Sequence, residues 1–143
     1  RVTGVQTCAL RSRPAIEVVK DYGELPPIFC YAGQLNQVFM NVLGNAIDAL
    51  QAAEVPQLTI STRLDSGTVL IAIADNGGGM SEEVRSQIFN PFFTTKPIGQ
   101  GTGMGLSISY QIVTDRHGGS LACDSTIGEG TLFTIRIPQS QPD

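Results

Sequence analysis

The chain has 143 residues, of which 41% are hydrophobic and 15% charged, and its formal net charge is −4. This length fits one domain with a buried core, and the acidic balance argues against a nucleic-acid partner because phosphate backbones attract basic surfaces. No apolar run approaches the roughly 20 residues of a membrane span, so we expect no membrane contact, and three cysteines without metal spacing favour a cytoplasmic setting.

The N-terminal residues differ in character from the rest of the chain. Val2–Leu10, which reads VTGVQTCAL, resembles the translation of a sequencing-library adapter. We therefore expect residues 1–12 to be a non-native tail without function, and residues 13–143 to form the domain. Because a predicted strand begins almost at once, we expect the natural domain to have lost sequence at its start.

Two strands and one long helix are expected in the first third of the domain. Apolar alternation predicts a strand at Ala15–Asp21, and Ile28–Tyr31 is expected to form a second, short strand. Apolar residues then recur at helical spacing over Gln34–Ala52, which predicts a helix with one buried face. No Ser, Thr, Asp or Asn stands where it could cap the start of this helix.

The rest of the chain mixes strands and helices. Strands are predicted at Leu58–Leu64, Thr68–Asp75, Ser120–Ser125 and Thr131–Ile137, with turns at Asp65-Ser66-Gly67 and Gly128-Glu129-Gly130. A short helix capped by Ser81 and a longer one over Gly103–Arg116 complete the set. Because the order is not a strict βαβ alternation, we predict an α+β fold, a two-layer sandwich with helices on one face of a mixed sheet.

A polar stripe runs beside the apolar face of the first helix. At 100° per residue, Gln37, Asn41, Asn45 and Asp48 share this stripe, and Asn45 lies at its border with the apolar face. An amide oxygen in such a place suits Mg²⁺, which keeps waters and bridges phosphates. A solvated helix edge is the alternative interpretation.

A glycine-rich segment, Asp75-Asn-Gly-Gly-Gly-Met80, ends the strand over Thr68–Asp75. Gly77 and Gly79 permit positive φ and the close approach of a flat ligand. A carboxylate at Asp75 can accept a hydrogen bond from the exocyclic amine of adenine, whereas the carbonyl of guanine would be repelled. An ordinary Asp-Asn-Gly turn is the alternative.

A second glycine cluster, Gly101-x-Gly103-x-Gly105, opens the later long helix. Its backbone N–H groups can hold phosphate at the positive end of the helix. The spacing differs from the dinucleotide fingerprint, and the Gly-Lys-Ser/Thr ending of a P-loop is absent. Lys96 stands ahead of it and either reaches a terminal phosphate or is only solvated.

Aromatic and histidine residues are expected to be structural. Phe89, Phe92 and Phe93 surround Pro91 and are expected to pack as an anchor for the irregular segment that follows. His117 is the only histidine and stands at a predicted helix end before two glycines. We expect it to be neither a catalytic base nor a phosphoacceptor.

Taken together, these segments resemble the catalytic ATP-binding domain of two-component sensor histidine kinases, in the wider group that includes Hsp90, MutL and gyrase B. The resemblance covers about Ala15 to Ile137. It rests on an N box at Gln37–Ala49, a G1 box at Asp75–Gly79, an F box at Phe89–Lys96, a G2 box at Gly101–Gly105, and the turn Gly128–Thr131. Any one of these is weak evidence, but their order is specific.

The resemblance implies a Bergerat-type fold with ATP and Mg²⁺ as cofactors. Asp75 would bind the adenine amine, Asn45 would bind Mg²⁺, and Asn41 and Lys96 would act at the phosphates where transfer occurs. Thr94–Thr102 would form a short lid. The residues expected at the nucleotide are Asn41, Asn45, Asp48, Asp75, Gly77, Gly79, Met80, Thr95, Lys96, Gly101, Thr102, Gly103, Met104, Gly105, Leu106 and Thr131. Asp48 departs from the basic residue that many of these kinases carry, although an acid is familiar in the wider group.

The implied activity is transfer of the γ-phosphoryl group of ATP to a histidine on a separate dimerisation domain, with a response regulator downstream. No such histidine-bearing helix is present, so we expect a monomeric fragment that does not phosphorylate itself. The related ATPases carry Glu at the position of Asn41, and an amide cannot act as that base. The alternative is an ATP-binding regulatory module or an ATPase of the same fold.

Overall fold

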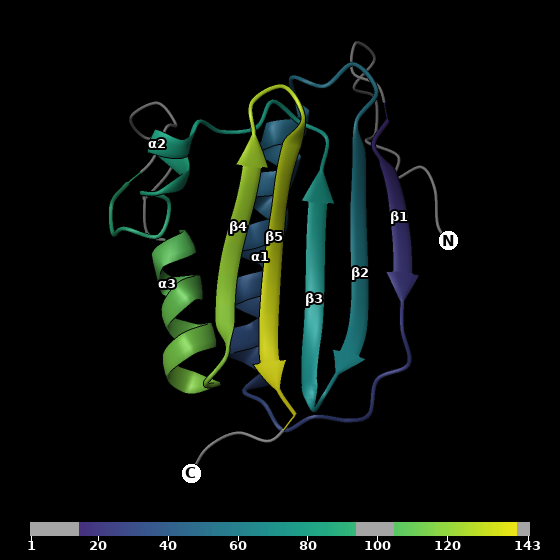
Figure 1. Ribbon diagram of the computed structural model, residues 1–143, viewed down its shortest axis with the longest axis vertical. Helices are drawn as coiled ribbons and strands as arrows, with labels where there is room; N and C mark the ends of the chain where they lie inside the picture. Colours follow the sequence, from purple (N-terminus) through teal and green to yellow (C-terminus); the bar gives the residue numbers. More distant parts are fainter. Residues whose placement is uncertain (1–14, 94–104, 140–143) are drawn as a thin grey trace.

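Five strands form one mixed sheet in the computed structural model, which describes residues 15–93 and 105–139. They are β1 (Glu17–Tyr22), β2 (Gln57–Asp65), β3 (Thr68–Asp75), β4 (Ser120–Thr126) and β5 (Gly130–Pro138). Their order across the sheet is β1-β2-β3-β5-β4 (Figure 1). β1 pairs with β2 in parallel, and the other three pairs are antiparallel. The predicted α+β fold is confirmed, and the expected tail at residues 1–12 lies outside the described residues.

The β2–β3 hairpin has the tight turn that its sequence predicts. Asp65 pairs with Thr68, so Ser66 and Gly67 alone form the loop. Both have positive φ, 52° and 82°, as a type I′ turn requires. This turn fixes the register of β3, and with it the position of Asp75 at the end of the strand.

The helix α1 (Ala32–Leu50) covers one face of the sheet and is seen behind β4 and β5 in Figure 1. Its buried residues follow the predicted helical spacing; they are Leu35, Val38, Val42, Ala46 and Leu50. They pack in one core with Ile73 of β3 and with Phe133, Ile135 and Ile137 of β5. The helix begins two residues earlier than predicted and, as expected, has no side-chain cap at its start.

The predicted short strand at Ile28–Tyr31 is wrong, because this segment is an irregular approach to α1. Pro26 and Pro27 precede it and have no backbone N–H for a strand ladder. The backbone N–H of Tyr31 instead donates to Nε2 of His117, 3.0 Å away. A contact with a residue 86 positions later in the chain therefore replaces the strand.

The helices α2 (Glu82–Arg85) and α3 (Gly105–Gln111) follow β3 along the chain. Ser81 caps α2 as predicted, since its Oγ accepts the backbone N–H of Val84 at 3.2 Å. The helix α3 stands beside β4 in Figure 1 and continues into a π-helical turn, η1 (Ile112–Arg116). The sequence predicted an uninterrupted α-helix up to Arg116, so this wider turn is a correction.

His117 accounts for the wider turn. It is fully buried, and its Nδ1 bonds the carbonyl oxygen of Ile112 at 2.9 Å, five residues back. Gly118 then takes a left-handed φ of 64°, and the N–H of Gly119 bonds the carbonyl of Val113 at 2.9 Å. The N–H of Gly118 also donates to the carbonyl oxygen of Thr114 at 3.1 Å, which is the bond of an αL helix ending. The predicted structural role of the histidine agrees with this burial and bonding.

Candidate functional site

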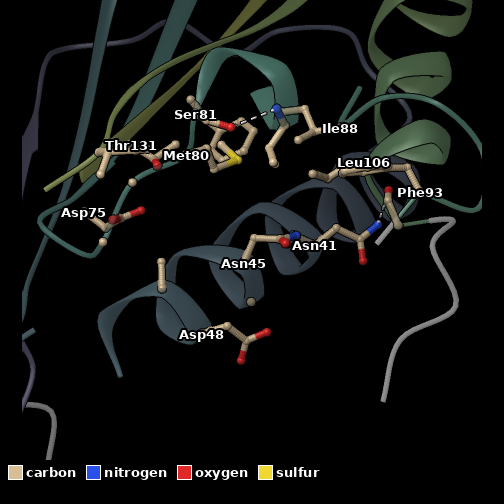
Figure 2. A pocket seen from close by; sticks show the side chains of 18 of the residues that line it. Asn41, Asn45, Asp48, Asp75, Met80, Ser81, Ile88, Phe93, Leu106 and Thr131 are labelled. Carbon is tan, nitrogen blue, oxygen red and sulfur yellow. Dashed lines mark hydrogen bonds between the residues drawn. The ribbon is translucent and has the colours of Figure 1, made fainter. Parts of the chain in front are cut away.

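A cavity of about 790 Å³ opens between α1, the segment after β3, β5 and the first turn of α3 (Figure 2). The predicted site residues that line it are Asn41, Asn45, Asp48, Asp75, Gly79, Met80, Gly105, Leu106 and Thr131. Thr95, Lys96, Gly101, Thr102, Gly103 and Met104 lie outside the described residues. The fold thus gathers in one cavity residues that are up to 90 positions apart in the sequence, from Asn41 to Thr131.

Asp75 is the last residue of β3 and its side chain is buried. Its Oδ1 accepts the backbone N–H of Gly77 at 2.8 Å. Burial raises the pKa of Asp75 above its ordinary value of 3.8, and backbone hydrogen bonds from Gly77 and Thr131 oppose this rise only in part. A buried carboxyl group with acceptor capacity to spare is the kind of group that binds an N–H donor of a ligand.

Gly77 and Gly79 both pack closely against protein backbone, and of the two only Gly79 also lines the cavity. A Cβ on Gly77 would lie 2.4 Å from the carbonyl oxygen of Ala49, and Gly77 does not line the cavity. Gly79 has a φ of +73°, and its Cβ would lie 2.1 Å from the carbonyl oxygen of Thr126. Both close approaches are therefore to protein backbone, and only Gly79 has the positive φ that we expected of both.

A set of hydrogen bonds ties this segment to the turn between β4 and β5. The N–H of Gly128 donates to the carbonyl of Gly78 at 2.9 Å, and the N–H of Met80 donates to Oγ of Ser125 at 2.7 Å. The Oγ of Ser125 also lies 2.8 Å from Oγ1 of Thr131. Hydrogen bonds thus hold together the wall that carries Asp75 and Thr131, and Figure 2 shows these two residues together on one side of the cavity.

Asn41 and Asn45 project from successive turns of α1 (Figure 2). The Nδ2 of Asn41 donates to the carbonyl oxygen of Gly105 at 3.0 Å and to Oγ of Ser109 at 3.1 Å. The Nδ2 of Asn45 donates to the carbonyl oxygen of Asn41 at 2.8 Å. Carbonyl oxygens only accept, so each amide nitrogen must face the protein in this way. Both amide oxygens are therefore left for the cavity.

These oxygens form a donor set that suits a hard cation. Within the described residues, no group of three or more His, Cys, Asp or Glu gathers as an all-protein metal cage. Magnesium does not need one, because it keeps several waters and takes much of its coordination from substrate phosphates. The oxygens of Asn41 and Asn45, with the Asp48 carboxylate on the next turn of α1, fit an ion of that kind.

Apolar residues supply much of the cavity wall and were not predicted as site residues. They are Met40, Ala49, Val84, Ile88, Phe93, Ile127 and Phe133, and the small or polar residues Gly44, Gly78 and Ser81 join them. Met40 and Gly44 directly precede Asn41 and Asn45 on α1 and have the same spacing of four residues. This helical spacing could have identified them as residues on the same side of the helix. Ile127 lies in a turn, and the sequence carries no sign of its role.

The aromatic anchor is only partly as predicted. The rings of Phe89 and Tyr110 lie 5.2 Å apart between centroids, and Phe93 packs against the core at the cavity wall. Phe92, however, is 74% exposed and has a φ of +67°. The backbone turns at this residue and directs the side chain into solvent, so Phe92 is not an anchor.

In the described part of the chain, no helix is long and apolar enough to cross a bilayer.

Comparison with known proteins gives consistent matches. Residues 31–141 match the family model described as histidine kinase-, DNA gyrase B-, and HSP90-like ATPase. Sporulation kinase E of Bacillus subtilis (strain 168) is 42% identical over 118 residues, which are 82% of this chain and 15% of that protein. This chain therefore spans a small part of the length of that relative.

Solved structures resemble the whole described fold. The nucleotide-free catalytic domain of histidine kinase ThkA gives a TM-score of 0.76 at 31% identity, with 87% of this chain and 80% of that chain covered. Full-length ShkA in complex with AMPPNP gives a TM-score of 0.76 at 27% identity, with 89% of this chain and 26% of that chain covered.

Proposed function

The chain belongs to the family of histidine kinase-, DNA gyrase B- and HSP90-like ATPases, and from this premise we propose that its cavity binds ATP with Mg²⁺ as the nucleotide-binding part of a protein-histidine kinase. The observation that carries the proposal is the placement of different polar groups on opposite sides of one cavity. A buried carboxyl group, Asp75, stands on one side, and two amide oxygens, those of Asn41 and Asn45, stand on the other.

The Asp75 side is proposed to take the adenine base. Adenine presents an exocyclic amine that can donate to a carboxylate, whereas guanine presents a carbonyl oxygen at the same position. The apolar wall from Met80, Val84 and Ile88 supports the burial of a flat ring beside this carboxylate.

The amide side is proposed to take the phosphates and their metal ion. Asn45 and Asn41 would offer amide oxygens to Mg²⁺ or to its bound waters, and Gly105 and Leu106 of α3 line the same part of the cavity. When bound, Mg²⁺ would neutralise charge on the phosphate oxygens during transfer. Lys96 and the proposed lid lie outside the described residues, and their roles remain predictions.

We favour phosphoryl transfer over hydrolysis as the native reaction. The P–O bond to the γ-phosphorus would break, ADP would leave, and a P–N bond would form to the imidazole of a histidine on a dimerisation domain. Asn41 has no titratable group, so it cannot remove a proton from water. A response regulator would receive the phosphoryl group next. A nucleotide-binding module without transfer is the alternative that the second experiment tests.

The first experiment is a calorimetric titration with ATP and GTP, each with Mg²⁺ and with EDTA. We expect ATP to bind at least tenfold more tightly than GTP, and Asp75→Asn to remove this preference. Asp65→Asn is the matched control, because it removes an exposed carboxylate at the other end of the same hairpin. Equal affinity for ATP and GTP in the unsubstituted protein would exclude the adenine assignment.

The second experiment mixes the chain with the histidine-bearing dimerisation domain of a related sensor kinase and with ATP labelled in the γ-phosphoryl group. We expect acid-labile label on the dimerisation domain, and none when the chain is incubated alone. ATP binding without any transfer, across several dimerisation domains, would favour the binding module.

A further inference from the structure

Ser109 lies in α3, outside the cavity, and its side chain is fully buried. Its Oγ donates to the carbonyl oxygen of Gly105 at 2.8 Å, one turn earlier, and accepts from Nδ2 of Asn41 at 3.1 Å. The same Gly105 carbonyl accepts from Nδ2 of Asn41 at 3.0 Å. Ser109, Gly105 and Asn41 thus form a closed triangle of hydrogen bonds between α1 and α3.

This triangle fixes the direction of each bond. The Gly105 carbonyl has no proton to give, so both the Ser109 hydroxyl and the Asn41 amide must donate to it. With its only hydrogen used in this way, Ser109 Oγ can only accept from Asn41. Both hydrogens of the Asn41 amide are then held by α3, and its oxygen cannot exchange places with its nitrogen without facing two acceptors.

We propose that Ser109 is a positioning residue, which fixes the side-chain amide of Asn41 so that this residue presents an oxygen acceptor, and no N–H donor, to the phosphate side of the cavity. The amide oxygen can coordinate a cation or accept a hydrogen bond from a metal-bound water, but it cannot donate a hydrogen bond to an anionic phosphate oxygen. The consequence of this orientation for Mg²⁺ rests on the proposed function, whereas the orientation itself does not.

The chain offers a pair of substitutions that separate the hydroxyl from its volume. Ser109→Thr keeps a hydroxyl that can bond the carbonyl four residues back, and Ser109→Val has nearly the same shape without one. Both add the same bulk to a buried position, so any difference between them reports the hydrogen bonds. Ser107→Ala is the control for loss of another buried hydroxyl from α3.

The first measurement is NMR of the Asn41 side-chain amide without nucleotide. In the unsubstituted protein, in Ser109→Thr and in Ser107→Ala, we expect both hydrogens to exchange slowly with water. In Ser109→Val one hydrogen should exchange faster and shift. Identical Asn41 signals in the threonine and valine variants would overturn the proposal, whether or not the chain binds ATP.

The second measurement is the gain in ATP affinity that Mg²⁺ produces. We expect Ser109→Val to lose roughly tenfold of this gain, as expected for one lost buried hydrogen bond, and affinity in EDTA to change much less. Ser109→Thr should keep the gain. An equal loss with and without Mg²⁺ would show a merely structural role. If neither the variants nor the unsubstituted protein bind ATP, the proposed function fails, and the NMR result alone then decides the orientation of the Asn41 amide.

Discussion

The Nδ2 of Asn45 donates to the main-chain oxygen of Asn41, 2.8 Å away and one turn earlier on α1. The bond lies within one helix, so it keeps the amide of Asn45 in a fixed orientation without help from a ligand. The oxygen of Asn45 is thus in place for a cation before any nucleotide arrives, which is the kind of preorganisation that lowers the cost of binding.

Replacing Asn45 by leucine should remove the Mg²⁺-dependent part of ATP binding. Leucine has a similar size but offers no oxygen, so we expect the affinity for ATP with Mg²⁺ to fall about tenfold or more towards the value in EDTA. Calorimetry with and without EDTA measures both values. Gln51→Leu, at the exposed end of α1, is the matched control. An unchanged Mg²⁺ effect in the Asn45 variant would place the metal elsewhere.

The carboxyl group of Asp75 should make the stability of the protein depend on pH. Its pKa is raised by burial above 3.8, so the folded state holds this proton at a higher pH than the unfolded chain does. Its contribution to the free energy of unfolding is then largest below pH 3.8 and falls as the pH rises through the raised pKa.

Asp75→Asn removes this titration. The free energy of unfolding of the variant minus that of the unsubstituted protein should therefore be larger at pH 7 than at pH 3.5, so the variant is relatively more stable at pH 7. Urea unfolding at the two pH values measures the difference, and Asp65→Asn controls for loss of one negative charge from the same hairpin. The opposite order would mean that the folded protein stabilises the ionised form of Asp75.

Two neighbouring glycines should respond very differently to substitution by alanine. Gly79 has a φ of +73°, and its Cβ would meet the Thr126 carbonyl oxygen at 2.1 Å, so Gly79→Ala should cost about 2–3 kcal/mol of stability. A Cβ on Gly78 would meet nothing within 4 Å, so Gly78→Ala should change stability by about 0.5 kcal/mol or less. Thermal unfolding of both variants measures the two losses of stability. Equal losses would mean that the segment after β3 can move away from β4 to make room for the added Cβ.

The cysteines should differ in reactivity. Burial raises the pKa of Cys123 to about 12, so only about one thiol in ten thousand would be ionised at pH 8. Cys30 is exposed. In a variant with Cys8 replaced by serine, Ellman's reagent should therefore modify one thiol quickly in native protein and two after unfolding. Rapid modification of both in native protein would show that the core around Cys123 opens readily.

Local sequence patterns predicted the elements that depend on local physics. The helical spacing of Leu35, Val38 and Val42 identified α1, and the hairpin turn at Ser66-Gly67 followed from its turn residues. The elements that were missed depend on contacts between distant residues. The ring of His117 both removed the expected strand at Ile28–Tyr31 and widened the end of α3 into η1.

The same division holds for the candidate site. Asp75, Asn41 and Asn45 could be found because their residue types suit the chemistry and stand beside recognisable helix and glycine patterns. Ser109 could not, because a serine in an apolar helix carries no local sign that its hydroxyl meets an amide 68 positions earlier. The sequence predicts a close approach of a ligand at Gly77, and only the fold shows that the backbone of α1 also approaches this glycine closely.

The bond between Tyr31 and His117 also bears on the order in which the domain folds. It joins Tyr31, the residue before α1, to the side chain that ends η1, so this contact can form only after the chain has been made as far as His117. Thr131 of β5 also lines the cavity whose other side carries Asn41 and Asn45, so the cavity too needs residues from the end of the chain. A nascent chain would thus hold no finished cavity until its C-terminal strands had been synthesised, and slow exchange of the Tyr31 amide would mark the completed domain.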